Sequence, residues 1–361
     1  MRERPVIIVI GAGLAGAASA WALSRRFGPA AELLVLEKEV IPGSHASAQN
    51  AAMVRSLVDE PVLTRISIEG CQFWNQLPEE LAGPGLFRRN ASLLLAESED
   101  AWRRLQARAE EARGLGLHPE LWTAADCVRL LPMLADCPIR GAVYSPEDGI
   151  ADPASLIEHS LAAARGRGAQ LRLGSEVERL LHDEEGVLGL LLEDGERLEA
   201  NALVLAAGAW TEELLQRSGL PGRELLPRRR HLYASSPWPG LDPEAPFVWH
   251  VDAGAYFRPE GGGVLFSVCD EEVVPPGRPV VDDEVFAEAE QKLERIFPFL
   301  EEVPIAHAWA GLRTYADGGG FLLGPDPQLA GLSFAAGLGG HGVTCAGPVG
   351  QRVAESLVPK M

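Results

Sequence analysis

The first forty residues place a short apolar strand directly before a glycine-rich turn. Val6–Ile10 is rich in β-branched residues, which is typical of a strand buried inside a parallel sheet. It enters residues 11–16 (GAGLAG), and residues 17–27 follow as an Ala- and Leu-rich segment that we expect to be helical. A second apolar strand, residues 33–36, ends at Glu37. This order predicts a βαβ nucleotide-binding unit.

Each glycine of this turn has its own expected role. Gly11 permits the tight turn, Gly13 lets the backbone approach a pyrophosphate, and Gly16 allows the helix to pack closely on the strand. The N-terminus of the helix offers N–H groups and a positive dipole end to the phosphates. Glu37, 21 residues after Gly16, suits a ribose hydroxyl and disfavours the 2′-phosphate of NADP. The turn therefore predicts an adenine dinucleotide.

The rest of the chain bears on the choice between NAD and FAD. A compact NAD-binding domain usually completes its sheet within about a hundred further residues. Here the strand-and-glycine pattern returns only at residues 202–210 and 332–342. In the rest of the chain we expect helices over 100–113, 152–165 and 284–296, a hairpin region over 170–200, and an antiparallel sheet over 225–274. Nucleotide-type units at both ends imply interleaved domains and favour flavin.

Composition excludes several classes of protein. The chain has 361 residues, with 51 acidic against 32 basic and a formal charge of −19, so we expect no nucleic-acid partner. No apolar run approaches the 20 residues of a membrane span, and none suits a signal peptide. Five cysteines form no CxxC pair, and the eight histidines show no metal-binding spacing. We therefore expect a cytoplasmic protein with no transmembrane segment and no metal.

Several further motifs occur in an order that is typical of one family. They are residues 11–16 with Glu37, 42–52 (PGSHASAQNAA), 205–210 (LAAGAW), 227–230 (PRRR), 256–259 (YFRP), 309–313 (WAGLR) and 337–342 (GLGGHG). Over essentially its whole length, the sequence resembles the D-amino-acid oxidase/sarcosine oxidase superfamily of FAD-dependent amine oxidoreductases. Within it, the likeness is greatest to bacterial D-amino-acid dehydrogenases of the D-arginine type.

The resemblance implies an α/β FAD-binding Rossmann-like domain assembled from discontinuous segments. It also implies an α+β substrate domain whose antiparallel sheet covers the flavin face. We expect the FAD-binding domain to comprise residues 1–85, 140–220 and 306–361. The substrate domain would then comprise residues 86–139 and 221–305.

The implied cofactor is FAD, and we expect it to be bound non-covalently. Monomeric sarcosine oxidases attach flavin through a cysteine soon after the arginine that matches Arg313, whereas Thr314 and Tyr315 follow here. Motif and resemblance together imply the cofactor-binding residues Gly11, Gly13, Leu14, Ala15, Gly16, Glu37, Lys38, His45, Ala46, Ser47, Asn50, Ala51, Ala52, Val177, Ala207, Gly208, Trp210, Gly339, Gly340, His341, Gly342, Val343 and Thr344.

Two arginines carry the substrate hypothesis. Arg313 lies in an apolar setting, where an unpaired guanidinium is costly, and its planar fork suits a carboxylate. A structural ion pair is the alternative for Arg313. By resemblance, Arg230 and Tyr256 would hold the same carboxylate. Residues 228–230 can also be interpreted as a solvated run of charge.

His45 is the candidate group near the substrate amine. An imidazole titrates near neutral pH and could take the ammonium proton, which would free the lone pair to assist hydride departure. The alternatives are a structural contact to flavin or covalent flavin attachment. His341, in its glycine turn, is interpreted as a packing residue at the flavin edge.

These residues predict an FAD-dependent dehydrogenase or oxidase. Hydride would leave Cα of an amino acid, most simply a D-isomer, and the imino acid formed would hydrolyse to a 2-oxo acid. The electron acceptor would be oxygen or a quinone. Alternatives are oxidation of a secondary amine such as sarcosine or proline, a flavoprotein subunit of a hetero-oligomer, and a NAD-binding dehydrogenase. D-arginine relatives carry an acid where Gly83 or its neighbours lie here, so an apolar or neutral substrate side chain fits equally well.

Overall fold

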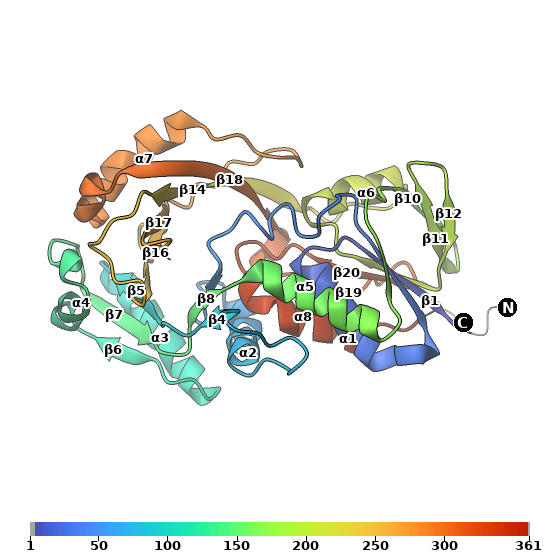
Figure 1. Ribbon diagram of the computed structural model, residues 1–361, viewed down its shortest axis with the longest axis horizontal. Coiled ribbons are helices and arrows are strands. Elements are labelled where there is room, and N and C mark those ends of the chain that lie inside the picture. The colour runs from blue at the N-terminus through green and yellow to red at the C-terminus, as the bar shows by residue number, and fades with distance from the viewer. Residues whose placement is uncertain (1–3, 360–361) are drawn as a thin grey trace.

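The computed structural model describes residues 4–359, and its largest elements are two sheets (Figure 1). The first sheet has six strands in the order β19-β20-β13-β1-β2-β9. Neighbouring strands are parallel, except that β19 runs antiparallel to β20. Its strands are β1 (Val6–Ile10), β2 (Glu32–Leu36), β9 (Gln170–Arg172), β13 (Ala202–Leu205), β19 (Leu322–Pro325) and β20 (Leu332–Ala336).

The alternation of side chains along β1 gives this sheet two covered faces. Ile7 and Val9 pack with helices, and Val6, Ile8 and Ile10 pack on the other side with a small sheet and a short helix. The first face is covered by α1 (Leu14–Phe27), α5 (Pro153–Gly166) and α8 (Gly342–Ser356). The second is covered by α6 (Thr211–Arg217), β10 (Val177–Asp183), β11 (Gly186–Leu192) and β12 (Arg197–Glu199).

Helices α1 and α8 lie against each other beneath the sheet. They approach so closely that a Cβ on Gly350 would overlap the backbone of Ala18. Because β1 and β20 run in the same direction, the helices that follow them both begin at the carboxyl edge of the sheet. Ligands of open α/β sheets bind at this edge.

The second sheet has eight strands in the order β18-β14-β17-β16-β15-β5-β7-β6. All neighbours are antiparallel apart from the parallel pair β15–β5. Its strands are β5 (Ser92–Ala96), β6 (Glu120–Trp122), β7 (Gly141–Ser145), β14 (Leu226–Ser235), β15 (Phe247–His250), β16 (Ala255–Glu260), β17 (Gly263–Ser267) and β18 (Ile305–Tyr315). The remaining elements are β3 (Met53–Val54), β4 (Phe87–Arg88), β8 (Gly149–Ala151), α2 (Thr64–Asn75), α3 (Glu99–Gly114), α4 (Ala124–Leu130) and α7 (Asp283–Ile296).

One face of the eight-stranded sheet packs on a hydrophobic core with α7, and the other face lies toward the nucleotide-binding part of the molecule. Phe257 packs on the side of α7, against Phe297, with ring centroids 5.0 Å apart. Its neighbour Tyr256 points to the opposite face, where it packs with Ala51 and Leu232. Because Ala51 follows the β2 region in the chain, this inner face lies against the nucleotide-binding part. The long pair β14–β18 also spans the two parts of the molecule (Figure 1).

The structure has the predicted architecture, a discontinuous parallel sheet beside a largely antiparallel one. The predicted domain boundaries differ from it at two strands. Our prediction assigns β7 and β18 to the FAD-binding domain, whereas both pair within the eight-stranded sheet. We keep the two-domain division as a proposal, with these strands moved to the substrate domain. Residues 1–3 and 360–361, which the prediction assigns to the FAD-binding domain, lie outside the described residues.

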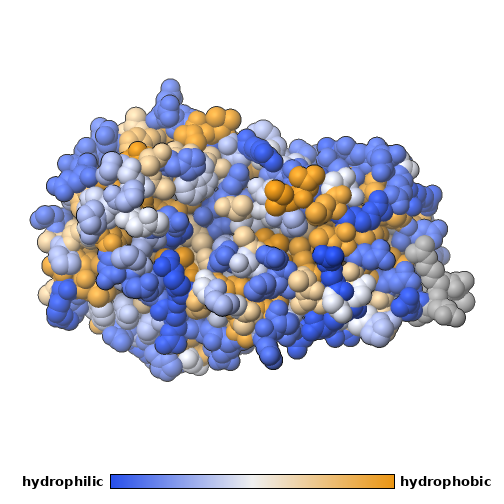
Figure 2. Space-filling model, viewed as in Figure 1, coloured by the Kyte–Doolittle hydropathy of each residue, from blue (hydrophilic) through white to orange (hydrophobic). Residues whose placement is uncertain are grey.

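The face of the molecule drawn in Figure 2 is mostly hydrophilic. Figure 2 shows exposed apolar residues only in separate patches on this face, which is ordinary for a globular protein. Within residues 4–359, none of the helices has the length and hydropathy needed to cross a bilayer. The same residues contain no group of three His, Cys, Asp or Glu side chains arranged to hold a metal ion.

Candidate active site

A large cavity opens at the carboxyl edge of the six-stranded sheet. It encloses about 1410 Å³ of empty space, the solvent at its mouth included. Its walls come from the β1–α1 turn, the segment after β2, the β13–α6 turn, β18 and the β20–α8 turn. Segments far apart in the sequence thus meet at one site.

The glycine turn has the geometry that its sequence predicts. Gly11 has φ +103°, and a Cβ there would lie 2.5 Å from the carbonyl oxygen of Ala206. Gly13 caps α1 in an extended conformation, and the N–H of Leu14 donates to Oγ of Ser47 at 3.0 Å. Gly16 does not line the cavity: a Cβ there would overlap the carbonyl of Gly11. A side chain at position 16 would therefore collide with the turn that joins β1 to α1.

Glu37 is fixed beside this turn. Its Oε2 accepts from the N–H of Ala12 at 2.7 Å, and its Oε1 accepts from the N–H of Glu39 at 3.0 Å. Each carboxylate oxygen has a further lone pair available for a ribose hydroxyl. The residue lines the cavity, as the ribose-binding role requires.

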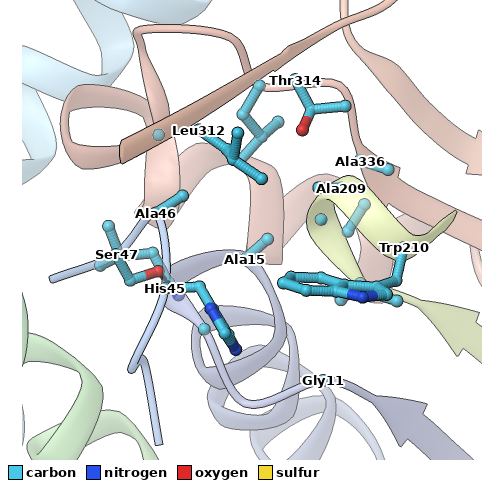
Figure 3. Close-up of a pocket in the computed structure, with 18 of the residues that line it drawn as sticks. Gly11, Ala15, His45, Ala46, Ser47, Ala209, Trp210, Leu312, Thr314 and Ala336 are labelled. Carbon is cyan, nitrogen blue, oxygen red and sulfur yellow. Dashed lines mark hydrogen bonds between the residues drawn. The ribbon is translucent and has the colours of Figure 1, made fainter. Parts of the chain in front are cut away.

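His45 lies at this same end of the cavity. Its Nε2 is 2.8 Å from Oε1 of Glu39, and its ring centroid is 4.5 Å from that of Trp210. Lys38 Nζ lies 3.4 Å from the Trp210 ring centroid. Figure 3 shows His45 and Trp210 near Gly11. The hydrogen bond to His45 is the largest cause that lowers the pKa of Glu39.

These contacts favour one of the alternatives for His45. The structure brings His45 to the nucleotide end of the cavity and records no contact between it and Arg230, Tyr256 or Arg313 within residues 4–359. The contacts therefore support a role in cofactor binding rather than as the base for the substrate amine.

The N-terminus of α8 forms the other end of the cavity. Gly339, Gly340, Gly342 and Val343 line the wall there. The helix begins after His341, whose side chain does not cap it, and no acidic residue lies in the first turn. This end therefore presents backbone N–H groups and a positive dipole to the cavity, which suits a group that gains negative charge.

Arg313 is brought to the site by the pairing of β14 with β18. Arg230 lies opposite Gly311, and Arg228 opposite Arg313, so all three arginines occupy one face of the ribbon. A Cβ on Gly311 would overlap the carbonyl of Gln49. Glycine at position 311 of β18 is therefore needed for the segment that contains Gln49 to pack against this strand.

Arg313 has no acidic partner among residues 4–359. It is buried, and its guanidinium donates to the carbonyls of Gln49 at 2.9 Å and Leu312 at 3.0 Å. Burial lowers its pKa. Two neutral carbonyls leave the positive charge uncompensated, which argues against a structural ion pair and for an anionic ligand.

Arg230 is also buried, so the solvated-run interpretation does not describe it. Its Nη2 lies 2.6 Å from Oε1 of Glu271 and 3.4 Å from the hydroxyl of Tyr315. Arg228 pairs with the other oxygen of Glu271 at 2.5 Å. The acidic residues 270–272 thus lie beside the basic residues 228–230. Glu271 contacts Arg230, the arginine predicted to bind the substrate carboxylate.

Tyr256 completes the proposed carboxylate site. It is buried on the inner face of the sheet, its ring stacks on Trp249 with centroids 4.8 Å apart, and burial raises its pKa to about 12. The charges of Arg313 and Arg230 both act on its hydroxyl. The charges of Arg313 and Arg230 and the hydroxyl of Tyr256 thus lie within electrostatic reach of one another, and of the three residues Arg313 lines the cavity.

Most of the predicted cofactor-binding residues line the cavity, and the others lie behind its wall. Ala51 packs under Tyr256, and Ala52 has φ +57°. The Nε2 of His341 lies 3.5 Å from Oε2 of Glu60, and Oγ1 of Thr344 accepts from the N–H of Arg55 at 3.1 Å. The predicted residues that do line it are Gly11, Gly13, Leu14, Ala15, Glu37, Lys38, His45, Ala46, Ser47, Asn50, Val177, Ala207, Gly208, Trp210, Gly339, Gly340, Gly342 and Val343.

Sequence reasoning missed three polar residues of this region. Glu271 and Tyr315 contact Arg230, and Arg55 lies behind Trp249. Arg55 could have been found, because it follows the apolar residues 51–54 just as Arg313 follows an apolar stretch. Glu271 had no such signal, since it is one of many acids in exposed sequence.

The comparison with known protein families decides the identity of the fold. The family model described as "DAO: FAD dependent oxidoreductase" matches residues 7–356. The chain belongs to this family. It is therefore an FAD-dependent oxidoreductase, and the glycine cradle, Glu37 and the two helix N-termini fit FAD in the cavity.

Individual relatives of this DAO family chain are distant in sequence. The 4-methylaminobutanoate oxidase (formaldehyde-forming) of Paenarthrobacter nicotinovorans is 26% identical over 365 residues, which cover 97% of this chain but only 43% of that protein. The glycine oxidase of Geobacillus kaustophilus is 26% identical over 377 residues, covering 100% and 94%. The chain thus spans less than half the length of the first relative and nearly all of the second.

Solved structures show the same fold. L-proline dehydrogenase from P. horikoshii has a TM-score of 0.87 at 23% identity and covers 98% of this chain and 93% of its own. The Geobacillus kaustophilus glycine oxidase structure has a TM-score of 0.81 at 26% identity, with coverage of 98% and 94%.

Proposed function

We propose that this DAO family protein oxidises an amino acid, of the D-configuration, at the bond between Cα and nitrogen. Arg313, Arg230 and Tyr256 hold the substrate carboxylate. The observation that carries the proposal is Arg313, a buried guanidinium with two carbonyl acceptors and no acid among the described residues. A carboxylate supplies the missing charge in the bidentate geometry that guanidinium prefers.

Bound FAD supplies the two-electron acceptor for this reaction. The substrate loses a hydride from Cα and a proton from nitrogen, which gives an imino acid. Water then adds to the imine and ammonia leaves, so a 2-oxo acid is the final product. The protein contributes orientation, because an anchored carboxylate fixes where the Cα–H bond points. The positive end of α8 stabilises negative charge that develops at its end of the cavity.

A secondary amine is the second candidate substrate. The names of two relatives, 4-methylaminobutanoate oxidase and L-proline dehydrogenase, refer to secondary amines that carry a carboxylate. The same arginines would anchor such a molecule. The two candidates therefore differ in the reacting carbon and nitrogen rather than in the anchor.

Anaerobic mixing tests the proposal. Purified holoenzyme is mixed with a panel of D- and L-amino acids, sarcosine and proline, and the visible flavin absorbance is followed. Bleaching by D-acids supports the leading candidate, and bleaching only by sarcosine or proline supports the second. Admitting air then shows whether oxygen accepts the electrons or whether a quinone is needed. Holoenzyme that no amine reduces would contradict both candidates.

Arg313→Ala tests the anchor separately. We expect KM for the reducing substrate to rise at least 100-fold while the protein keeps its flavin, because a charge-assisted bidentate contact is lost. Arg179→Ala, which removes an exposed arginine of β10, is the matched control. Unchanged kinetics in Arg313→Ala would remove the anchoring role.

A further inference from the structure

Arg55 is a buried arginine that no motif of the sequence singles out. It follows β3 directly and is 8% exposed. Its backbone N–H donates to Oγ1 of Thr344 in the first turn of α8. Its guanidinium carbon lies 4.0 Å from the centroid of the Trp249 ring. The side chain therefore projects from the cofactor-binding part toward the inner face of the eight-stranded sheet.

Trp249 places this guanidinium beside the proposed carboxylate site. The Trp249 ring stacks on Tyr256, so the same indole ring contacts both Arg55 and the tyrosine. Arg55 and Arg230 also share neighbours. Burial lowers the pKa of His341, and the charges of both arginines lower it further; both charges also act on Cys269. The charges of Arg55 and Arg230 thus act on the same two residues, and the Trp249 ring contacts both Arg55 and Tyr256.

The guanidinium of Arg55 makes no hydrogen bond or ion pair with any residue that the structure describes. The other buried arginines of the region are partnered: Arg230 with Glu271, Arg258 with Glu260, and Arg313 with the Gln49 carbonyl. An indole face compensates only part of the cost of burying a guanidinium. The five N–H donors of Arg55 therefore have no acceptor among the described residues.

The nearest acid does not supply that acceptor. Glu60 lies within electrostatic reach of Arg55, but its carboxylate is engaged with Nε2 of His341 at 3.5 Å. The hydrogen bond with His341 is the main cause that lowers the pKa of Glu60 to about 2. Glu60 is thus ionised at neutral pH, and neither a hydrogen bond nor an ion pair joins it to Arg55 among the described residues.

We propose that Arg55 binds a second carboxylate of the substrate. The substrate class is then an amine with two carboxylates, such as an acidic amino acid or an iminodicarboxylate. One carboxylate lies at Arg313 and Tyr256, and the other lies at Arg55 beside Trp249. This inference rests on the proposed function, because it assigns a substrate class to the same site. It adds a specificity residue that the anchor at Arg313 does not require.

Ligand binding without turnover tests the inference. The holoenzyme is titrated with succinate and with butyrate, which has the same chain length and one carboxylate, and the shift of the flavin spectrum gives each Kd. We expect succinate to bind about 10- to 100-fold more tightly, as expected for one charge-assisted contact in a buried site. Arg55→Met should remove most of that difference, because it keeps the packing on Trp249 without the charge.

Two further variants make the result specific. Arg65→Met, which removes an exposed arginine of α2, should retain the preference for succinate. Arg55→Lys should retain part of it, since an ammonium lacks the planar fork. With substrates, the ratio of kcat/KM for D-glutamate over D-glutamine, or for iminodiacetate over sarcosine, should fall in Arg55→Met by a similar factor. If Arg55→Met does not fold, the wild-type and Arg55→Lys titrations decide.

The outcomes separate this inference from the proposed function. Succinate that binds no more tightly than butyrate, or a preference that Arg55→Met leaves unchanged, overturns the second carboxylate site. Reduction by monocarboxylate amines in that same case would leave the proposed function standing. Conversely, Arg55-dependent succinate binding in a protein that no amine reduces would support the site and overturn the proposed function.

Discussion

Arg230 contacts the carboxylate of Glu271 at 2.6 Å, in the position where a substrate carboxylate would be anchored. Glu271 belongs to residues 268–282, a segment that follows β17 and runs along β14. The segment is tied down by Asp270 with His231 at 2.7 Å and by Asp282 with Arg229 at 2.8 Å. Glu271 would thus compete with the carboxylate of the substrate that we propose Arg230 binds.

Glu271→Gln should therefore lower KM. Removing the negative charge leaves Arg230 more available, and partly exposed ion pairs of this kind are worth only about 0.2–1 kcal/mol, so we expect a decrease of about two- to fivefold. Glu272→Gln, which weakens the pair with Arg229 on the other side of the strand, is the control. A KM that rises in Glu271→Gln would show that Glu271 helps substrate binding instead of opposing it.

Gly11→Ala should abolish retention of flavin. The backbone at Gly11 has φ +103°, which costs an alanine on the order of 1–3 kcal/mol, and the new Cβ would press on the carbonyl of Ala206. Gly28→Ala is a matched control, because φ is +48° there but nothing lies within 4 Å of a Cβ. The ratio of flavin to protein absorbance after purification measures the effect. Equal loss in both variants would mean that strain alone, and not the overlap, is responsible.

The flavin should be released when the protein is denatured. Within the described residues, His45 is the only histidine or cysteine that lines the cavity, and its Nε2 is occupied by Glu39. We expect acid precipitation to leave all of the yellow colour in the supernatant. A yellow pellet that becomes colourless in His45→Ala would instead identify His45 as an attachment site.

Asp148 should make the protein less stable as pH rises from about 4 to 6. It is fully buried, and burial raises its pKa from 3.8 to about 6, although Ser56 N–H, Ser92 Oγ and Cys71 Sγ donate to it. The folded state therefore binds a proton that the unfolded state releases in this range. The stabilisation is complete below the unfolded pKa and is lost as pH rises through the folded one; it amounts to about 3 kcal/mol.

Asp148→Asn should remove this pH dependence while keeping an acceptor for Ser56 and a donor for Ser92. Tm measured between pH 4 and pH 7 in both proteins gives the comparison. If the difference in Tm between wild type and Asp148→Asn stays constant over that range, Asp148 does not titrate there.

The ends of the chain were the most predictable part of the fold. At β1–α1 and β20–α8, an apolar strand, a glycine turn and a helix follow within a few residues, so local sequence determines the structure. The sheet to which a strand belongs is not local information. β7 and β18 have ordinary alternating patterns, and only long-range pairing with β5 and β14 assigns them to the substrate sheet.

The site divides in a similar way. Contacts with backbone, such as those of Gly11 and Glu37, follow from the motif and its spacing. The partner of a charged side chain does not. Arg228 and Arg230 are two residues apart on one face and share Glu271, yet one is half exposed and the other buried. The difference in exposure between Arg228 and Arg230 arises because residues 268–282 fold back along β14. No periodic pattern in the sequence predicts this.

The strand order of the six-stranded sheet also determines when the cofactor can be bound during synthesis. Strand β1 lies between β2 and β13, and β13 in turn pairs with β20, which leaves the ribosome after the other strands of this sheet and just before α8. A nascent chain of about 300 residues has an open edge at β13 and lacks one end of the cavity. All the walls of the flavin cavity are therefore present only after β20 and α8 have left the ribosome.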